Sequence, residues 1–405
     1  MTVTPPAVAS LPVSDADPFA AEHLASPEPL HRTLREAGPV VHLSRYDVYA
    51  IARYREVRAA LVDWQHFQSG AGVGLANFNH EKPWRPPSLL LEADPPQHDA
   101  PRSVLREILA PPALCRLRER WQEVADDLVD TVLAQQGDTF DAFTALAAAF
   151  PLRVFPDAVG LPPDGREHLL PYGNLAFNAF GPRNDLVAAD GHRMAELSAW
   201  VNGRCRREVL DEHGFGARIW AAADRGDLTH EQAPLVVRSL LTAGVDTTVH
   251  GIAAVLYAFA THPDQWQQLR ERPELARAAF DEAVRWQSPV QTFFRTATAD
   301  VDVAGAVVPK GTKILMFLGS ANRDPGRWDN PDRFDLTRDP SGHVGFGMGI
   351  HQCIGQHVAR LEAEALLSAL ARRVERIDIT GEPERHLNNT LRSWASLPVH
   401  VHRAT

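Results

Sequence analysis

The chain is poor in cysteine, with only Cys115, Cys205 and Cys353 among its 405 residues. An odd, small number in a long chain disfavours a disulfide framework and fits a reducing cytosol. No uncharged apolar stretch reaches about 18 residues, which a membrane-spanning helix needs. The N-terminus lacks the basic start and apolar core of a secretory signal. These absences predict a cytoplasmic protein with no membrane contact.

Positive charge is also scarce, with 41 basic against 51 acidic residues and a net charge of -10. A net acidic chain without basic runs argues against nucleic acid or an anionic membrane as its main partner. There is no internal repeat, low-complexity segment or convincing linker. Length alone favours two or three domains of about 150 residues. Residues 1–18, which are rich in Pro, Ala, Ser and Val, are expected to form a flexible arm.

Helical spacing dominates the rest of the chain. Short strands are expected at 40–43 and 48–52, a helix at about 54–62, and an irregular segment over 67–96 that is typical of a lid or binding loop. The longest helix begins at a capping box over 229–232 and ends before Pro263, about 50 Å away. The pattern predicts a mainly α fold with small β-sheets, and its other helices are expected over 98–109, 114–135, 141–159, 164–180, 190–210 and 354–373.

The strongest chemical signal is the turn from Phe346 to Gly355, which contains Cys353. Its glycines allow a tight turn and a close approach to a flat partner. The turn leads into a helix, whose N-terminus favours a thiolate. A lone thiolate on a rigid turn suits an axial haem ligand. The alternative, a buried structural cysteine, leaves the Phe, the glycines and the His at these spacings unexplained.

This turn resembles the cytochrome P450 signature Phe-Gly-x-Gly-x-x-x-Cys-x-Gly, and further matches run over about 38–400. The resemblance implies a triangular single domain over 19–405, rather than two or three domains, because motifs spread over residues 98–355 must converge on one haem. A long central helix would lie over this haem b, whose iron Cys353 ligates. Cys115 and Cys205 are interpreted as packing residues. Glu282 and Arg285, three apart on one helix face, can pair. With Arg333 they resemble the family's structural Glu-Arg-Arg network.

The middle of the long helix carries Thr242, Gly244, Asp246 and Thr247 among apolar residues. A glycine there costs about 1 kcal/mol, and buried polar groups need partners. A polar contact between helices is one interpretation. The other is a locally opened helix that manages water and protons, since the segment resembles the family's Ala-Gly-x-Asp-Thr motif. By that resemblance Thr247 bonds to dioxygen on the iron and Asp246 helps to deliver protons.

Haem propionates require cations. His98 and Arg102, four apart, can point the same way, and Arg295 and His351 complete the set that the resemblance implies. Scattered surface charges are the alternative for any one of them alone. In an extended segment Phe293 shares a face with Arg295, so Phe293 is expected to face the haem cavity.

The irregular segment and the long helix also suggest a carboxylate site. Arg85 and Ser88 lie among stiffening prolines, and Arg238 and Ser239 precede Asp246 by one to two turns. Cations and hydroxyls over an apolar pocket suit a desolvated carboxylate. Aromatic walls would come from Phe177, Phe180 and Phe293. A solvated Arg85 and ordinary core phenylalanines are the alternative.

Residues 81–88, 177–182 and 288–295 resemble one bacterial subfamily, which oxidises para-substituted benzoic acids. The resemblance implies demethylation of 4-methoxybenzoate to 4-hydroxybenzoate and formaldehyde. Arg85, Ser88, Arg238 and Ser239 would then form the carboxylate end. Thr242 departs from the serine of the subfamily and could tighten the pocket. The residues expected around the ring are Leu91, Phe177, Phe180, Thr242, Ala243 and Phe293.

No nucleotide fingerprint or iron–sulfur cysteine cluster is present. A monooxygenase of this kind therefore implies separate partners, a ferredoxin and an NAD(P)H-dependent ferredoxin reductase, for an enzyme expected to be monomeric. Docking on the cysteine side could use Arg106, Arg116, Arg360 or Arg373. Two other functions remain open: oxidation of another aromatic acid such as a cinnamate, and a non-catalytic haem sensor or carrier. A peroxide-driven enzyme fits less well, because such enzymes usually lack the Asp-Thr pair.

Overall fold

The chain forms short strands that gather into small sheets. In the computed structural model, which describes residues 11–404, the largest sheet has the strand order β1-β2-β3-β9-β6-β4. Its inner strand β9 is buried along its whole length. The other sheets are β10-β13-β5, β11-β12 and β7-β8. The strands are Val13–Ser14 (β1), Val41–Leu43 (β2), Val48–Ile51 (β3), Phe67–Gln68 (β4), Thr139–Asp141 (β5), Thr292–Ala297 (β6), Val301–Val303 (β7), Ala306–Val308 (β8), Lys313–Phe317 (β9), Val374–Ile379 (β10), Glu384–Leu387 (β11), Arg392–Ser396 (β12) and Pro398–Arg403 (β13).

Helices make up most of the remaining structure, as the spacing of apolar residues predicts. They are Ala21–Ala25 (α1), Glu28–Ala37 (α2), Tyr54–Val62 (α3), Asp99–Ile108 (α4), Pro111–Gln135 (α5), Ala149–Val159 (α6), Leu169–Asn178 (α7), Asp185–Gly191 (α8), Met194–Arg204 (α9), Phe215–Asp224 (α10), Gln232–Ala243 (α11), Asp246–Thr261 (α12), Pro263–Glu271 (α13), Ala276–Gln287 (α14), Leu318–Ala321 (α15) and Gln356–Arg373 (α16). A π-helix over Phe143–Ala148 precedes α6.

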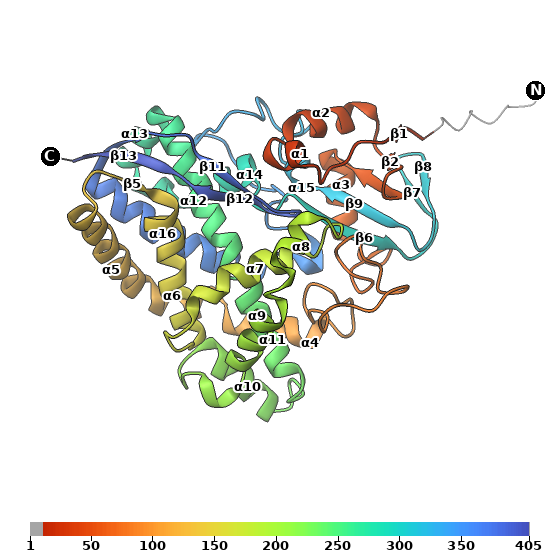
Figure 1. Cartoon of the computed structure of the whole chain (residues 1–405), viewed down its shortest axis with the longest axis horizontal. Helices are drawn as coiled ribbons and strands as arrows, with labels where there is room; N and C mark the ends of the chain where they lie inside the picture. Colours follow the sequence, from red (N-terminus) through yellow and green to blue (C-terminus); the bar gives the residue numbers. More distant parts are fainter. Residues whose placement is uncertain (1–10, 405) are drawn as a thin grey trace, which may run out of the picture.

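Figure 1 shows a roughly triangular outline, with the six-stranded sheet and helices α1, α2, α3 and α15 on one side and most of the other helices on the opposite side and at the lower apex. Helix α12 passes through the middle, between α7 and α16. It contributes Ile252, Val255 and Phe259 to the main apolar core, to which α14 and α16 also contribute. The predicted fold class, mainly α with small sheets, is confirmed.

Several expected elements occur at or close to their expected bounds. The strands expected at 40–43 and 48–52 are β2 and β3, and the helix expected at 54–62 is α3. Helices α1, α2, α8 and α10 were not expected from the sequence. The expected flexible arm is wrong for residues 13–14, which pair with β2 as a parallel strand. The arm's residues 1–10 lie outside the described residues.

The long central helix is interrupted. Its start is capped as expected, because the Thr229 N–H donates to Gln232 Oε1 at 2.9 Å and the Gln232 N–H donates to Thr229 Oγ1 at 3.1 Å. Helix α11 ends at Ala243 and α12 begins at Asp246. Together, Gln232–Thr261 is long and apolar enough to cross a membrane, but 72% of its most apolar window is buried inside the protein. The pair is therefore a core helix with a break in its middle.

Candidate haem and substrate site

The turn before α16 holds Cys353 in a fixed backbone. Gly347 and Gly349 have φ angles of +64° and +68°, which side chains rarely adopt. A Cβ on Gly349 would lie 2.7 Å from the carbonyl oxygen of Leu61, so helix α3 packs directly on this turn. The Cys353 N–H donates to the carbonyl of Phe346 at 2.7 Å and closes the turn. The structure therefore presents a single sulfur on a rigid, glycine-dependent loop.

The electrostatic surroundings of Cys353 differ from the expectation. Burial raises the pKa of its thiol, and the backbone N–H groups of Gly355 and Gln356, with Arg102 and Arg360, only partly oppose that rise. The helix N-terminus alone thus does not make this cysteine a thiolate. A bound metal cation would supply the missing stabilisation, because a coordinating thiol loses its proton.

The other two cysteines have different surroundings. Cys205 is buried as expected, and burial raises the pKa of its thiol to about 12. Cys115 is exposed on α5, so the prediction that it packs in the core is wrong. Neither lies in a glycine-rich turn.

Three of the four residues expected around haem propionates have a buried side-chain nitrogen without a hydrogen-bond partner in the described chain. The rings of His98 and His351 meet edge to face, with centroids 4.9 Å apart. His98 Nε2, His351 Nε2 and Arg102 Nε are buried and have no hydrogen-bond partner within residues 11–404. Asp94 Oδ1 lies 3.6 Å from His351 Nε2, beyond hydrogen-bond distance. Because buried donors are normally satisfied, the three atoms indicate a further acceptor group at this place. The carboxylates of a haem fit that requirement.

Arg295 adds an isolated cation to this group. Its side chain is 3% exposed, and Nη1 donates to the carbonyl of Phe294 at 2.9 Å. In the described part of the chain no carboxylate lies within 4.0 Å of it. Burial lowers its pKa to about 10, and Asp94 opposes this shift. Asp94, missed from the sequence, lies 3.6 Å from His351 Nε2.

The break in the central helix lies at Gly244. A Cβ on this residue would be 2.5 Å from the ring of Phe155 on α6, so only glycine fits. Thr247 Oγ1 donates to the carbonyl of Ala243 at 2.9 Å, and Thr248 Oγ1 donates to that of Gly244 at 3.3 Å. Hydroxyls thus bond carbonyls at the opened turn. The expectation of a locally opened helix is confirmed.

Asp246 and Thr247 point in different directions. Asp246 is 3% exposed, and a Cβ on Gly173 would lie 2.7 Å from its Oδ2, so the carboxylate packs against helix α7. Thr247 is less buried and lies in line with Ala243 and Ser239 at spacings of four. Asp246 therefore faces α7, whereas Ser239 faces Ser88 of the irregular segment. Asp246 Oδ2 is buried without a hydrogen-bond partner in the described chain.

His250, one turn after Asp246, was also missed from the sequence. Its Nε2 lies 3.3 Å from Asp246 Oδ1. Its Nδ1 accepts the backbone N–H of Trp394 at 3.4 Å, and its ring stacks on Phe143 with centroids 5.7 Å apart. An accepting Nδ1 requires the hydrogen on Nε2, so His250 donates to the carboxylate. The spacing of four residues was the only sequence signal for this pair.

The residues expected at the carboxylate end do meet. Ser88 Oγ and Ser239 Oγ are 3.3 Å apart, and Arg238 Nη2 donates to the carbonyl of Pro86 at 2.7 Å. Arg85 Nη1 donates to Glu92 Oε2 at 2.9 Å. The irregular segment thus lies against the second half of α11.

Glu92 is the acidic partner that sequence reasoning missed at this end. Its Oε2 also accepts the backbone N–H of Ser88 at 2.7 Å. Arg238 is 4% exposed, and no carboxylate of the described residues lies within 4.0 Å of it. Burial, and then the charge of Arg85, lower its pKa. One buried cation therefore remains without an anion.

The expected aromatic wall forms beside this polar end. The rings of Phe177 and Phe180 meet edge to face at 5.7 Å, and those of Phe180 and Phe293 lie 5.8 Å apart at 64°. Leu91 packs against this cluster, and its N–H donates to Ser88 Oγ at 3.1 Å. The apolar and polar ends are therefore contiguous. Two further members, Val73 and Leu391, were missed because they lie in irregular segments.

Thr242 and Ala243 lie at the end of α11, one turn after Arg238 and Ser239. Thr242 Oγ1 donates to the carbonyl of Arg238 at 2.9 Å, so its hydroxyl is used within the helix. Ala243 is exposed although Leu241 and Val245 beside it are buried.

An asparagine cluster fixes the aromatic wall. The N–H of Asn389 donates to Asn178 Oδ1, and Asn389 Nδ2 donates to the carbonyl of Asn178, both at 2.9 Å. Asn388 Nδ2 donates to the carbonyl of Asn174 at 3.1 Å. These bonds join the turn that carries Leu391 to helix α7, which carries Phe177.

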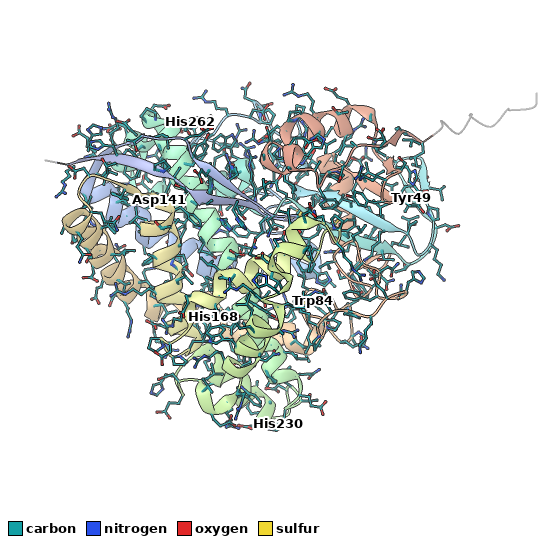
Figure 2. All side chains as sticks on the ribbon, in the orientation of Figure 1. Tyr49, Trp84, Asp141, His168, His230 and His262 are labelled. Atoms are coloured by element: carbon teal, nitrogen blue, oxygen red, sulfur yellow. The ribbon has the colours of Figure 1, made fainter. Side chains whose placement is uncertain are left out.

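The irregular segment over 67–96 also contacts the connection that follows helix α7. Figure 2 labels Trp84 on this segment. Trp84 is 38% exposed, and the guanidinium of Arg85 lies 5.4 Å from its ring centroid. Glu81 pairs with Arg183 at 2.6 Å, across to the connection between α7 and α8.

The structural network differs from the expected one in its third member. Arg285 is fully buried and donates to both oxygens of Glu282 at 2.7 and 2.8 Å. Arg338 supplies the second guanidinium, with Nε 3.1 Å from Glu282 Oε1. Arg333 contributes only its carbonyl, which accepts Arg285 Nη2 at 3.0 Å, while its side chain is 60% exposed. The assignment of the Arg333 side chain is therefore wrong.

Two of the four arginines considered for docking are already paired within the protein. Arg360 pairs with Asp281 at 2.8 Å and lies over the ring of Phe346. Arg373 pairs with Asp126 and Asp130. The other two, Arg106 and Arg116, are exposed.

Comparisons with known proteins agree with this geometry. The family model described as Cytochrome P450 matches residues 215–391. "Cytochrome p450 CYP199A2" of Rhodopseudomonas palustris is 56% identical over 97% of this chain and 95% of its own. "Cytochrome P450 monooxygenase PikC" of Streptomyces venezuelae is 32% identical over 98% of this chain and 96% of its own. The solved structure of "cytochrome P450 CREJ in complex with (4-ethylphenyl) dihydrogen phosphate" is 25% identical, covers 95% of this chain and 99% of its own, and has a TM-score of 0.85.

Proposed function

The chain belongs to the cytochrome P450 family and is a haem-binding monooxygenase, and on this premise we propose that it oxidises para-substituted benzoic acids. The reaction proposed first is conversion of 4-methoxybenzoate to 4-hydroxybenzoate and formaldehyde, with O₂ as co-substrate. The observation that carries this proposal is Arg238, a buried arginine that within residues 11–404 bonds only to carbonyls and lies beside the Ser88–Ser239 pair.

A buried charge needs a counter-charge. Leaving a guanidinium desolvated and unpaired is costly, and a substrate carboxylate would relieve that cost with charge-assisted hydrogen bonds. Arg85, Ser88, Arg238 and Ser239 would bind the carboxylate. The ring would pack against Phe177, Phe180 and Phe293, with Leu91, Thr242 and Ala243 along its path to the iron. Anchoring the far end determines which carbon reacts.

The haem would be held by residues that fit it. Cys353 would ligate the iron, and His98, Arg102, Arg295 and His351 would bind the propionates. The bound haem supplies the activation of O₂, which the side chains of the protein cannot perform. Asp246 would help to deliver protons, and Thr247 would present its hydroxyl at the opened helix turn. The aromatic wall and the asparagine cluster would keep bulk water from the reacting carbon.

Electrons must come from other proteins, as in the P450 family generally. For this chain we propose a ferredoxin and an NAD(P)H-dependent ferredoxin reductase, acting with a cytoplasmic monomer. Arg106 and Arg116, exposed on α4 and α5, remain candidates for the docking surface. Arg360 and Arg373 are weaker candidates because internal carboxylates already bind them.

Titration of the ferric protein tests the substrate class. We expect 4-methoxybenzoate to shift the Soret band toward the high-spin form, and 4-methoxybenzamide, which lacks the charge, to bind at least about tenfold more weakly. Equal affinity for the two would overturn the carboxylate site. A larger shift with 4-methoxycinnamate would favour the alternative of another aromatic acid. With a working redox pair, absence of NADH-dependent product would favour a haem sensor.

A further inference from the structure

Three charged side chains meet at the polar end of the pocket. The side chains of Arg85 and Glu92 are 10% and 4% exposed and pair at 2.9 Å. Arg238 is 4% exposed and bonds to the carbonyls of Pro86 and Pro87, at 2.7 and 3.4 Å. Two guanidiniums and one carboxylate therefore give this cluster a net charge of +1.

Glu92 is held as an ionised acceptor within the cluster. Its Oε2 accepts from Arg85 Nη1 at 2.9 Å and from the Ser88 N–H at 2.7 Å. Its own N–H donates to the Ser88 carbonyl at 3.0 Å, which closes a short turn over 88–92. Such bonds to a carboxylate oxygen are typical of the charged form. Glu92 thus neutralises Arg85 before any substrate arrives and leaves the charge of Arg238 uncompensated.

We infer that Glu92 sets the charge of this site, so that it accepts a head group with one negative charge and rejects one with two. This inference rests on the proposed function, because it takes Arg238 as the substrate's counter-charge. One carboxylate brings the buried cluster to neutrality, whereas a dianion leaves an excess negative charge out of water. Glu92 is then a specificity residue that acts through Arg85 and Ser88.

The test compares head groups of one shape and different charge. At about pH 8.5 4-methoxybenzenesulfonate carries one charge and 4-methoxyphenylphosphonate two, and both are tetrahedral. Dissociation constants would be measured by spectral titration, with 4-methoxybenzoate as the reference. We expect the wild-type protein to bind the phosphonate at least about tenfold more weakly than the sulfonate.

The decisive variant is Glu92→Gln, which raises the cluster to +2 while keeping the size of the side chain. We expect the affinity for the phosphonate, relative to that for 4-methoxybenzoate, to rise at least about tenfold. If the ratio of the dissociation constants for the phosphonate and for 4-methoxybenzoate is the same in Glu92→Gln and in the wild type, the inference is overturned. This holds whatever the affinity of the wild type for the sulfonate. Glu92→Asp keeps the charge, and its ratio should stay within about threefold of the wild type.

A second variant covers the case in which Glu92→Gln fails to bind haem, as judged by its reduced carbon monoxide spectrum. The double variant Arg85→Gln/Glu92→Gln removes a charge pair and restores the net charge of +1, and removing both partners avoids an unpaired buried arginine. We expect the ratio of its dissociation constants for the phosphonate and for 4-methoxybenzoate to return to within about threefold of the wild-type ratio. A larger departure contradicts the charge count.

The two proposals fail in different ways. If wild-type protein binds 4-methoxybenzamide as tightly as 4-methoxybenzoate, the proposed carboxylate site fails. If the wild-type protein binds 4-methoxybenzoate more tightly than 4-methoxybenzamide, the proposed carboxylate site stands. If Glu92→Gln then leaves the affinity for the phosphonate relative to 4-methoxybenzoate unchanged, only the role of Glu92 fails.

Discussion

Asp246 and His250 form a buried pair one helical turn apart on α12, with His250 Nε2 3.3 Å from Asp246 Oδ1. The contact holds one carboxylate oxygen and leaves the other, Oδ2, against Gly173 with no donor among the residues that the structure describes. His250 is in turn fixed by the Trp394 N–H and the ring of Phe143. The orientation of the proposed proton carrier is therefore set by a histidine.

Replacing His250 by Phe should impair proton delivery without weakening substrate binding. The phenyl ring can still stack on Phe143, but it cannot donate to Asp246, and a buried carboxylate that loses its donor is destabilised. We expect NADH-dependent turnover to fall by about tenfold and the solvent isotope effect on turnover in D₂O to increase. The dissociation constant for 4-methoxybenzoate should change by less than about threefold.

His250→Gln is the matched control, since its amide can donate to the carboxylate. We expect it to recover a large part of the turnover. If both variants show the wild-type isotope effect, His250 has only a packing role.

Replacing Arg85 or Arg238 by Ala should raise the dissociation constant for 4-methoxybenzoate at least tenfold, because each removes a buried cation from the carboxylate end. Arg206→Ala is the control, because Arg206 is 68% exposed and pairs only with exposed Glu208. Spectral titration measures all three variants. Unchanged affinity in both pocket variants contradicts the assignment.

Most of the elements that carry the site could be predicted because their sequence signals are local. The glycine pattern around Cys353 describes a turn whose backbone angles glycine alone adopts freely, and the opened helix follows from Gly244 beside hydroxyl residues. Helix α3 was predicted from apolar spacing within one short segment.

The residues that were missed act through contacts distant in sequence. Leu391 reaches the aromatic wall through a bridge to Val290 and through the asparagine bonds to α7, which is more than 200 residues away in sequence. Arg338 replaces Arg333 because the chain after Phe334 folds back over Glu282, which no motif spacing encodes. Glu92 is seven residues from Arg85, and only the turn over 88–92 brings them together.

Acid should destabilise the protein through His31. Burial lowers the pKa of His31 to about 3, against 6.5 for an ordinary histidine. Below pH 6.5 the unfolded chain therefore binds a proton at His31 that the folded chain does not bind. The free energy of unfolding falls as the pH drops from 6.5 toward 3. Lowering the pH from 7 to 5 should therefore reduce the free energy of unfolding by roughly 2 kcal/mol.

Urea unfolding at these two pH values checks this linkage. His31→Gln should show a pH dependence that is smaller by about that amount. The exposed-site control His213→Gln should behave like the wild type. If the free energy of unfolding changes equally with pH in the wild type and both variants, the role of His31 is contradicted.

Gly244→Ala should destabilise the protein, because a Cβ there lies 2.5 Å from both the Phe155 ring and the Leu240 carbonyl. Overpacking of this kind costs about 1–3 kcal/mol. Gly203→Ala on α9 is the matched helical control, since the structure describes no atom within 4 Å of its Cβ. That substitution should be neutral or stabilise by up to about 1 kcal/mol. Similar unfolding free energies for the two variants would show that Gly244 is not sterically required.

The structural network allows a comparison between two arginines five residues apart. Arg338→Ala removes a half-buried guanidinium from Glu282, which is itself fully buried, and should cost about 1–3 kcal/mol of stability. Arg333→Ala removes a side chain that is 60% exposed and should change stability by less than about 0.5 kcal/mol, since its carbonyl still accepts from Arg285. Chemical denaturation of both holoproteins measures the difference. If Arg333→Ala has the larger effect, the Arg333 side chain belongs to the network after all, and the assignment of Arg338 is wrong.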